Sequence, residues 1–395
     1  MPSSLHNYLV ITGSYWAFTL TDGAIRMLVV LYFHQLGYSP FEVAMLFIFY
    51  EFFGIITNLV GGWLGARIGL NLTLHLGLGL QVAALLLLTV PDHWLSVGYV
   101  MFAQALSGIA KDLNKMSAKA SVKILVSDGT NSKLFKWVAV LTGSKNTLKG
   151  AGYFAGAILL ECLGFRDTLL VLASLLIITL IVSVVLLPQH LGKTPYKAKF
   201  SQFKSNIAAI NWLSAARFFL FGARDIWFVV ALPVFLYDVL GWSFTSVGTF
   251  MAIWIIGYGM VQAGTPKILT QNNLGYSPTG KTAKGLALIL SLCPVAIAIA
   301  LQHSGPQEWI IVSGLTLFGI LFALNSSVHS YLILAYSEHN KVAMNVGFYY
   351  MANAGGRLLG TLLSGWVYQS HGLEGCLWLS SAFILTAAIL SFRLP

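Results

Sequence analysis

Long apolar runs, separated by short polar breaks, make up most of this chain. Each run is about 20 residues or longer, the length at which a helix crosses the hydrocarbon core of a bilayer. Helices satisfy every backbone hydrogen bond within the segment, so they are the expected spanning structure. The pattern predicts an all-α integral membrane protein with twelve transmembrane helices at 7–34, 41–66, 71–90, 94–123, 134–161, 167–187, 206–237, 244–266, 284–302, 308–336, 341–370 and 374–392.

Composition supports this class and excludes others. Hydrophobic residues make up 57% and charged residues 9% of the 395 positions, whereas a soluble domain has about 25% charged residues. The net charge of +10 does not indicate nucleic-acid binding, because the basic residues are divided between loops and helix interiors. Cys162, Cys293 and Cys376 show no metal-ligand spacing, so we expect neither a disulfide framework nor a thiol metal site. We expect no cleaved signal peptide, since the N-terminus lacks a basic segment and a cleavage site.

Basic residues in the breaks set the orientation. With the N-terminus in the cytoplasm, thirteen Lys and Arg residues fall on the cytoplasmic side and only Arg166 falls in an outer loop. We therefore expect both termini in the cytoplasm of a cell whose inner or plasma membrane holds the protein. The basic, polar break at 188–205 is the predicted linker between an N-terminal six-helix bundle, 1–187, and a C-terminal one, 206–395.

The two halves resemble each other. LGYS at 36–39 and LGWS at 240–243 each follow a span with an interior Asp, and GIAKDLN at 108–114 matches GILFALN at 319–325. An offset of 208 pairs further positions, namely Gly152 with Gly360, Gly164 with Gly372 and Lys149 with Arg357. Such matches predict two pseudo-symmetric bundles related by a twofold axis along the membrane normal, with a cavity between them.

Interior charge is concentrated on particular spans. The third, sixth, ninth and twelfth spans have no charged residue in their interiors, so we expect them at the periphery. The span at 94–123 carries Lys111, Lys115, Lys119 and Lys123, which recur every fourth residue and form one helical stripe. Charge inside a bilayer is costly, and a stripe of this kind indicates a wet, anion-attracting cavity. For Lys119 and Lys123 the alternative is snorkelling to the cytoplasmic surface.

Basic side chains are the main candidates for substrate binding. Arg forks suit the oxygens of oxyanions such as phosphate, and interior acids number four against eight bases, which leaves about four positive charges after pairing. The alternative is internal ion pairing, for instance of Asp22 with Arg26 at i,i+4 spacing, or of Asp225, which adjoins Arg224, with another helix. The candidate bases are Arg26, Lys111, Lys115, Lys145, Lys149, Arg217, Arg224 and Arg357.

Neutral polar residues in the spans complete the candidate site. Asn114, Asn146, Asn325, Asn353 and Tyr349 are candidates to contact hydroxyl or carbonyl oxygens of a substrate, with interhelical hydrogen bonding as the alternative. Tyr350 and His329 are further candidates to line the cavity, but a lone histidine such as His329 is more often a satisfied core residue. The candidate proton carriers are the interior acids Glu51, Asp22 and Asp225, in that order. The sequence has no Walker motif and no nucleophile, His and acid constellation, so we expect no ATP, other cofactor, catalytic residue or metal site.

A loop motif adds a family resemblance. The string GGWLGARIGLN at 61–71 resembles the signature between the second and third helices of the major facilitator superfamily. Gly62, Leu64, Arg67 and Gly69 match it, whereas Ala66 stands where the family usually has Asp. The resemblance implies the fold of that superfamily, with twelve helices in two bundles.

A more specific resemblance covers most of the chain. The stretches 7–40, 57–71, 105–121 and 141–157, for example ALSGIAKDLNKMSAKAS, are similar to the ArsJ-type organoarsenical efflux permeases. The resemblance implies export of 1-arseno-3-phosphoglycerate, which a partner glyceraldehyde-3-phosphate dehydrogenase makes from arsenate and glyceraldehyde 3-phosphate. The product decays to arsenate outside the cell, so the pair confers arsenate resistance. No binding residue is carried over from the family.

Three other functions compete with this one. An organophosphate importer or antiporter of the same superfamily would need the same cationic site. A membrane-embedded enzyme would need a catalytic constellation, which the sequence does not show. A hydrophobic-drug exporter is disfavoured, because eight interior bases would repel a cationic drug and leave a neutral one unable to pair with them.

Overall fold

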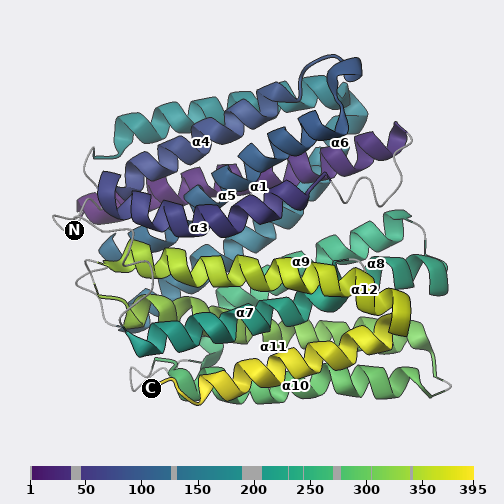
Figure 1. Ribbon diagram of the computed structural model, residues 1–395. Coiled ribbons are helices and arrows are strands. Elements are labelled where there is room, and N and C mark those ends of the chain that lie inside the picture. The colour runs from purple at the N-terminus through teal and green to yellow at the C-terminus, as the bar shows by residue number, and fades with distance from the viewer. Residues whose placement is uncertain are drawn as a thin grey trace. The chain divides into compact units, whose positions relative to one another are not determined.

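The computed structural model is almost entirely helical in the residues that it describes, which are 2–36, 46–125, 131–188, 207–229, 231–242, 244–269, 277–303, 305–338 and 341–395. Figure 1 shows the helices in chain order. They are α1 (Pro2–Gln35), α3 (Ile48–Ile68), α4 (Leu70–Leu87), the 3₁₀ turn η1 (Asp92–Trp94), α5 (Val97–Leu125), α6 (Asn131–Leu186), α7 (Ala208–Phe228), α8 (Ala231–Val234), the π-helical turn η3 (Phe235–Val239), α9 (Phe244–Leu269), α10 (Gly280–Leu301), α11 (Gln307–Tyr336) and α12 (Val342–Ser391).

Two of these helices each contain two of the predicted spans. The backbone of α6 is non-helical at Gly164, with φ of 78°, and that of α12 is non-helical at Gly372, with φ of 61°. Glycine adopts positive φ at little cost. In Figure 1, α12 runs one way in lime green and returns in yellow after its kink. The kinks fall in the predicted breaks, so the helices correspond to the twelve predicted spans and the predicted all-α membrane fold is confirmed.

Glycine also ends α3. Gly69 lies between α3 and α4 with φ of 101°, a conformation that other residues rarely adopt. It is one of the residues that match the loop signature, so the local backbone accounts for a glycine at that position. Much of the signature's remaining side-chain structure lies outside the described part of the chain.

The helices form two compact units. Unit 1 consists of 1–129, 144–204 and 338–351, and unit 2 of 130–143, 205–337 and 352–395. Unit 1 thus contains α1, α3, α4, α5 and most of α6, and unit 2 contains α7 to α11 and most of α12. The predicted linker, 188–205, lies outside the described residues except for Pro188.

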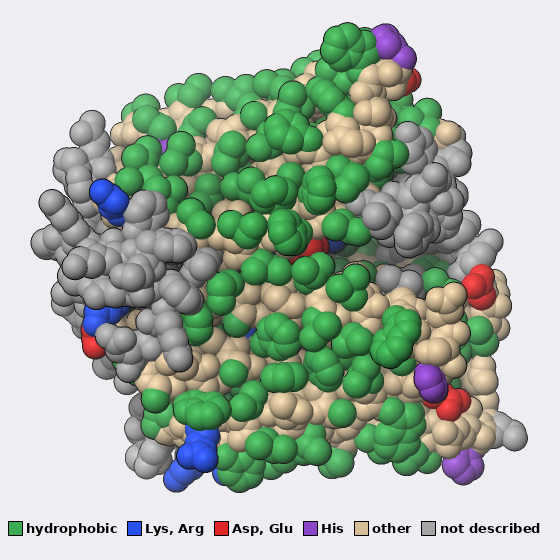
Figure 2. Space-filling view, in the orientation of Figure 1, with side chains coloured by type: hydrophobic (Ala, Val, Ile, Leu, Met, Phe, Trp, Pro, Cys, Tyr) green, Lys and Arg blue, Asp and Glu red, His purple; other side chains and the backbone are tan. Residues whose placement is uncertain are grey.

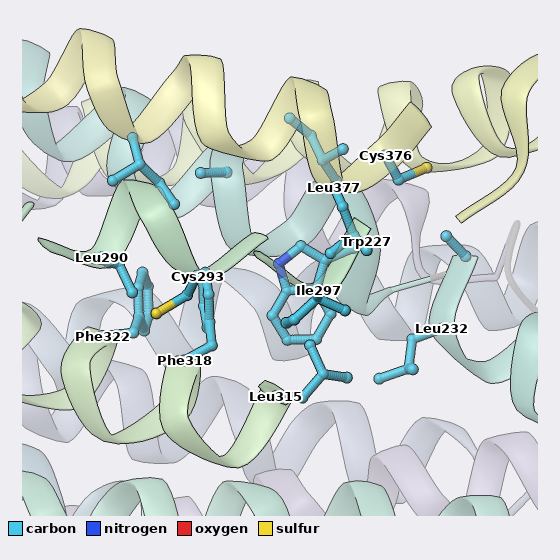
Figure 3. Packing of buried hydrophobic residues seen from close by; sticks show 14 of the residues in the cluster. Trp227, Leu232, Leu290, Cys293, Ile297, Leu315, Phe318, Phe322, Cys376 and Leu377 are labelled. Carbon is cyan, nitrogen blue, oxygen red and sulfur yellow. The ribbon is translucent and has the colours of Figure 1, made fainter. Parts of the chain in front are cut away.

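Aromatic and aliphatic residues together fill the core of unit 2, as Figure 3 shows. Trp227 of α7 packs edge to face against Phe318 of α11, with ring centroids 5.0 Å apart, and against Trp254 of α9 at 5.9 Å. The Trp254 indole N–H donates to the carbonyl of Leu315 at 2.9 Å, which satisfies its one polar group. Cys293 lies in this apolar cluster and has no disulfide partner.

Close glycine contacts recur at matching positions of the two units. A Cβ added to Gly152 of α6 would lie 3.2 Å from the Cα of Gly23 on α1. A Cβ added to Gly360 of α12 would lie 3.1 Å from the Cα of Gly222 on α7. Small residues let membrane helices approach this closely. The predicted pair Gly152 and Gly360 therefore has the same structural role in each half.

The outer surface of the helices is apolar. On the face in Figure 2, hydrophobic side chains predominate along the helices of each unit. The four predicted charge-free spans expose large apolar residues, among them Leu76, Val185, Leu292 and Ile389. Length and composition alone qualify five described segments to cross a membrane, namely Leu70–Leu87, Ile158–Leu186, Gly280–Leu301, Gln307–Tyr336 and Met344–Ser391.

Candidate functional site

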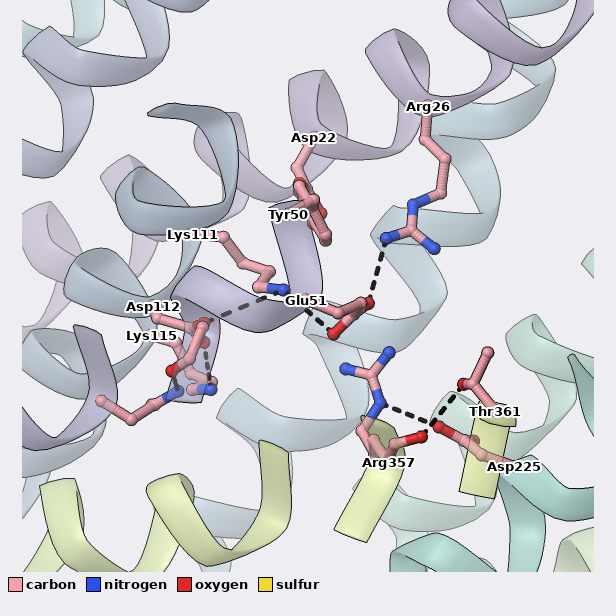
Figure 4. A network of polar contacts seen from close by, with 12 residues as sticks. Asp22, Arg26, Tyr50, Glu51, Lys111, Asp112, Lys115, Asp225, Arg357 and Thr361 are labelled. Atoms are coloured by element: carbon pink, nitrogen blue, oxygen red, sulfur yellow. Dashed lines mark hydrogen bonds and ion pairs between the residues drawn. The ribbon is translucent and has the colours of Figure 1, made fainter. Parts of the chain in front are cut away.

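Unit 1 contains a chain of alternating charges that joins three helices (Figure 4). The carboxylate of Glu51 on α3 lies 3.3 Å from Nη2 of Arg26 on α1 and 3.7 Å from Nζ of Lys111 on α5. Lys111 also lies 3.8 Å from the carboxylate of Asp112, which pairs in turn with Lys115. Bases and acids therefore alternate from α1 to α5, and the bases outnumber the acids in the chain.

Asp22 forms a second ionic centre in the same unit. Its side chain is 3% exposed, lies 3.2 Å from Nζ of Lys149 on α6, and accepts a 2.5 Å hydrogen bond from the Tyr50 hydroxyl. The predicted pairing of Asp22 with Arg26 is wrong, because Arg26 pairs with Glu51 instead. An i,i+4 pair contributes only about 0.2–0.5 kcal/mol, whereas a buried acid without a base is far more costly. The tertiary partners therefore decide the pairing.

The lysine stripe of α5 continues into the protein interior. Lys115 and Lys119 are 8% and 4% exposed, and their ammonium groups lie 4.6 and 5.3 Å from the ring centroid of Tyr350. The snorkelling interpretation of Lys119 is therefore wrong, and the side chain of Lys123 lies outside the described part. Tyr349 is buried and packs edge to face on Tyr350 at 5.0 Å.

The remaining candidates of unit 1 lie on α6 and α5. Lys145 and Asn146 are half-buried on α6, one turn before Lys149. The Asn114 amide donates to the carbonyl of Ala110 at 2.9 Å, and a Cβ at Gly77 of α4 would lie 3.0 Å from its Cγ. This position favours helix packing over substrate contact for Asn114.

Asp225 is the ionic centre of unit 2. It is fully buried, accepts a 2.7 Å hydrogen bond from Nε of the neighbouring Arg224, and lies 3.0 Å from Nε of Arg357 on α12. Figure 4 shows the second of these contacts. The predicted pairing of Asp225 with another helix is confirmed. Lys149 and Arg357, which the repeat matches, thus each pair with an aspartate on the first helix of their own half.

Arg217 is also buried in unit 2, with 3% of its surface exposed. Its Nε donates to the Asn353 side-chain oxygen at 2.9 Å, and its Nη1 donates to the Ser326 hydroxyl at 3.2 Å and carbonyl at 3.3 Å. Its guanidinium carbon lies 3.6 Å from the ring centroid of Phe221. These contacts fix the orientation of the guanidinium group through neutral acceptors and a ring.

Two further polar residues of α11 are buried. Asn325 and His329 lie one turn apart and are at most 1% exposed. Neither the amide atoms of Asn325 nor Nδ1 of His329 has a hydrogen-bond partner among the described residues. His329 is therefore a buried histidine, but one whose Nδ1 is not satisfied within the described part.

Positive charge exceeds negative charge in the interior of each unit. Of the predicted site residues, unit 1 holds five bases against the acids Asp22, Glu51 and Asp112, and unit 2 holds three bases against Asp225. The predicted surplus of four interior bases is therefore two in each unit. The buried Lys119, which is not in that count, adds one more base to unit 1. Among the described residues, no group of three or more His, Cys, Asp or Glu is arranged to hold a metal ion.

Sequence reasoning missed Tyr50, Phe221 and Ser326. Tyr50 and Phe221 lie in aromatic runs, FIFYEFF and RFFLFGAR, whose pattern is that of ordinary apolar helices. Ser326 follows Asn325, and only its contact with Arg217 distinguishes it from other helix serines. The match between 108–114 and 319–325 is an offset of 211 positions, and the same offset aligns Lys115 with Ser326. This alignment with a candidate base was the one sequence feature that pointed to Ser326.

The fold and the charged interior define a multi-pass membrane transporter. Residues 11–327 match the family model described as Major Facilitator Superfamily, and the chain belongs to that superfamily. No curated protein matches the sequence.

Several solved structures share the fold of this chain. A bacterial homologue of the iron transporter ferroportin, in an outward-facing state with soaked iron, is 14% identical with a TM-score of 0.75, over 98% of each chain. The human organic anion transporter MFSD10 (TETRAN) is 15% identical with a TM-score of 0.75, also over 98% of each chain. The proton:xylose symporter XylE, bound to 6-bromo-6-deoxy-D-glucose, is 13% identical with a TM-score of 0.77, over 99% of this chain and 96% of its own.

Proposed function

We propose that this protein is a secondary transporter that exports an organic phosphate or arsenate anion across the inner membrane, and that the anion is 1-arseno-3-phosphoglycerate. One observation carries the proposal, namely the surplus of two interior bases in each unit. Charge in a membrane interior is expensive unless it meets water, a partner or a ligand. An anionic substrate supplies the missing negative charge.

The charge of the proposed substrate suits this surplus. Its phosphate and arsenate groups together carry about three to four negative charges near neutral pH, by analogy with phosphate monoesters. Arg357, Arg217 and Arg224 offer guanidinium forks, which bind tetrahedral oxyanions in bidentate fashion. A transporter of the same fold, MFSD10, is described as an organic anion transporter.

The resemblance to the ArsJ-type permeases supplies the particular substrate. The four similar stretches fall on α1, α3, α5 and α6, which are the helices that carry Asp22, Glu51, Lys111 and Lys149. The functional partner is then a glyceraldehyde-3-phosphate dehydrogenase that makes the arsenical. Both chain termini face the cytoplasm, and the gradient of the substrate or of another ion supplies the energy.

Everted membrane vesicles test the proposal. Vesicles that contain the protein are given arsenate, glyceraldehyde 3-phosphate, NAD and the dehydrogenase, and arsenic inside the vesicles is measured. We expect accumulation only when all components are present, and none in vesicles that lack the transporter. Equal accumulation without the dehydrogenase would show that arsenate itself is the substrate, and no accumulation would refute export of the arsenical.

An organophosphate antiporter is the second candidate, because the same cationic interior suits it. Vesicles preloaded with phosphate distinguish the two functions. Exchange of internal phosphate for external glycerol 3-phosphate, without any dependence on arsenate, would favour the antiporter. Accumulation of arsenic from phosphate-free vesicles would favour the exporter.

A further inference from the structure

Helix α11 carries a polar segment within an otherwise apolar sequence. Residues 325–330 read NSSVHS, and each of the six is at most 1% exposed. In the interior of a membrane protein, a buried polar group needs a hydrogen-bond partner from the protein, from bound water or from a ligand. The partners of this segment, which belongs to unit 2, therefore indicate what it does.

Two serines of the segment have partners in the protein. The Ser326 hydroxyl accepts a hydrogen bond from Nη1 of Arg217 on α7 at 3.2 Å. The Ser327 hydroxyl donates to the carbonyl of Gln262 at 3.4 Å and accepts from the Thr265 hydroxyl at 3.3 Å, both on α9. One serine therefore faces α7 and the next faces α9, as expected from a helix that rotates about 100° per residue.

Three other side chains of the segment have polar atoms without a hydrogen-bond partner among the described residues. These atoms are both amide atoms of Asn325, Nδ1 of His329 and Oγ of Ser330. On a helical projection the three residues lie within about 100° of Ser326, two on one side of it and one on the other. Arg217 is also close enough to His329 for its charge to act on the ring. The unsatisfied atoms therefore flank the point at which Arg217 contacts α11.

The chemistry of these atoms suits a hydroxyl group better than an oxyanion. The side-chain oxygen of Asn325 only accepts hydrogen bonds, so it needs a donor, whereas an ionised oxyanion offers acceptors alone. A hydroxyl group donates one hydrogen bond and accepts others, and it can satisfy an amide, an imidazole nitrogen and a serine together. Because Arg217 lies beside them, these side chains suit a hydroxyl group that is close to an anionic group.

We propose that Asn325, His329 and Ser330 form a hydroxyl-binding site beside Arg217 within unit 2. The inference rests on the proposed function and deepens it. It gives the substrate class as an organic oxyanion that carries a hydroxyl group next to an anionic group. In the proposed substrate this is the hydroxyl group on the central carbon of the glycerate. Arg217 attracts the neighbouring anionic group, and the three side chains of α11 recognise the hydroxyl.

Two stable anions that differ by one hydroxyl group test the assignment. 3-Phosphoglycerate carries this group on its central carbon and 3-phosphonooxypropionate lacks it, while the carboxylate of each stands in for the acyl arsenate. Each anion is titrated against the purified full chain in nanodiscs. We expect wild-type protein to bind 3-phosphoglycerate at least about 10-fold more tightly, because the other anion leaves the site's polar atoms unsatisfied.

Variants of the site should lose this preference. In Asn325→Leu we expect the ratio of the two dissociation constants to fall to between about 1 and 3, because the variant has no amide to satisfy. In Ser330→Ala we expect the ratio to fall at least about threefold. Ser330→Thr keeps the hydroxyl group and should keep the wild-type ratio.

A control variant separates hydroxyl recognition from helix packing. Ser327→Ala removes a buried hydroxyl from the same segment, but one whose partners are on α9. We expect it to change both dissociation constants by the same factor, so that their ratio is preserved. Ligand-free Asn325→Leu should unfold at the same temperature as wild type or higher, because it buries no unsatisfied amide, whereas Ser327→Ala should unfold at a lower temperature.

The outcomes discriminate between the two proposals. If wild-type protein binds neither anion, both the proposed function and this inference fail. Equal binding of the two anions would show that the unsatisfied atoms hold water only, and it would refute the inference alone. A preference that Asn325→Leu and Ser330→Ala both keep would also refute only the hydroxyl-binding site. Should Asn325→Leu fail to fold, Ser330→Ala makes the same test by removing a single oxygen atom.

Discussion

The pair formed by Asp22 and Lys149 allows a test that separates substrate binding from stability. Lys149→Ala leaves Asp22, which is 3% exposed, with the Tyr50 hydroxyl as its close hydrogen-bond donor. Breaking a buried ion pair costs about 3–5 kcal/mol. The retained hydrogen bond to a charged group contributes about 1.5–3 kcal/mol, so we expect the variant to lose about 1.5–2 kcal/mol of stability.

The double variant Asp22→Asn/Lys149→Ala removes both charges together. No charge is then left buried without a partner, and the amide can still accept the Tyr50 hydrogen bond. We expect its stability to return to within about 1 kcal/mol of wild type. If Lys149 binds the anion, transport stays about 10- to 100-fold below wild type, because one charged hydrogen bond to the substrate is missing.

Three measurements decide the outcome. Growth on arsenate reports transport, immunoblotting of membranes reports abundance, and thermal unfolding of purified protein reports stability. A double variant as unstable as Lys149→Ala would refute the buried-charge reasoning. A double variant that transports normally would show that Lys149 only neutralises Asp22. The parallel variant in unit 2 is Asp225→Asn/Arg357→Ala, which also removes the aspartate that Arg224 contacts.

Three more predictions concern neighbouring features. At matched abundance, Arg357→Lys should lose more growth on arsenate than Lys149→Arg, because only an arginine has the bidentate fork; equal losses would contradict this. Glu51→Gln should make transport in everted vesicles insensitive to an imposed pH gradient, and an unchanged response would remove Glu51 as the proton carrier. Gly152→Leu should reduce membrane abundance because its Cβ meets α1, whereas Gly79→Leu, with nothing within 4 Å, should not.

Features that depend on local sequence were predictable. The apolar runs placed the spans because a bilayer requires a minimum helix length and permits few charges. Gly164 and Gly372 were matched by the repeat, and both have the positive φ that only glycine adopts readily. The surplus of interior bases could be counted directly, since it depends on residue types and not on their partners.

The partners of those charges were not predictable from spacing. Asp22 pairs with Lys149, 127 positions away, and Arg26 pairs with Glu51 on another helix. The i,i+4 spacing favoured an ion pair of Asp22 with Arg26. Which base pairs with Asp22 depends, however, on which helices lie next to each other. Tyr50 was missed for a related reason, because its two cations come from α1 and α5, and a tyrosine in an aromatic run has the pattern of a core residue.

The ion pairs also bear on how the proposed export would be driven. Every interior acid of the described part contacts a base: Asp22, Glu51, Asp112 and Asp225 all have partners in their own unit. Protonating one of these acids releases a base for the substrate, so proton binding and anion binding favour each other. An inside-negative potential expels each negative charge with about 2.3 kcal/mol per 100 mV. The proposed substrate, with about three charges, would still be driven outward when one proton leaves with it, so the proposed export would require no exchange for external protons.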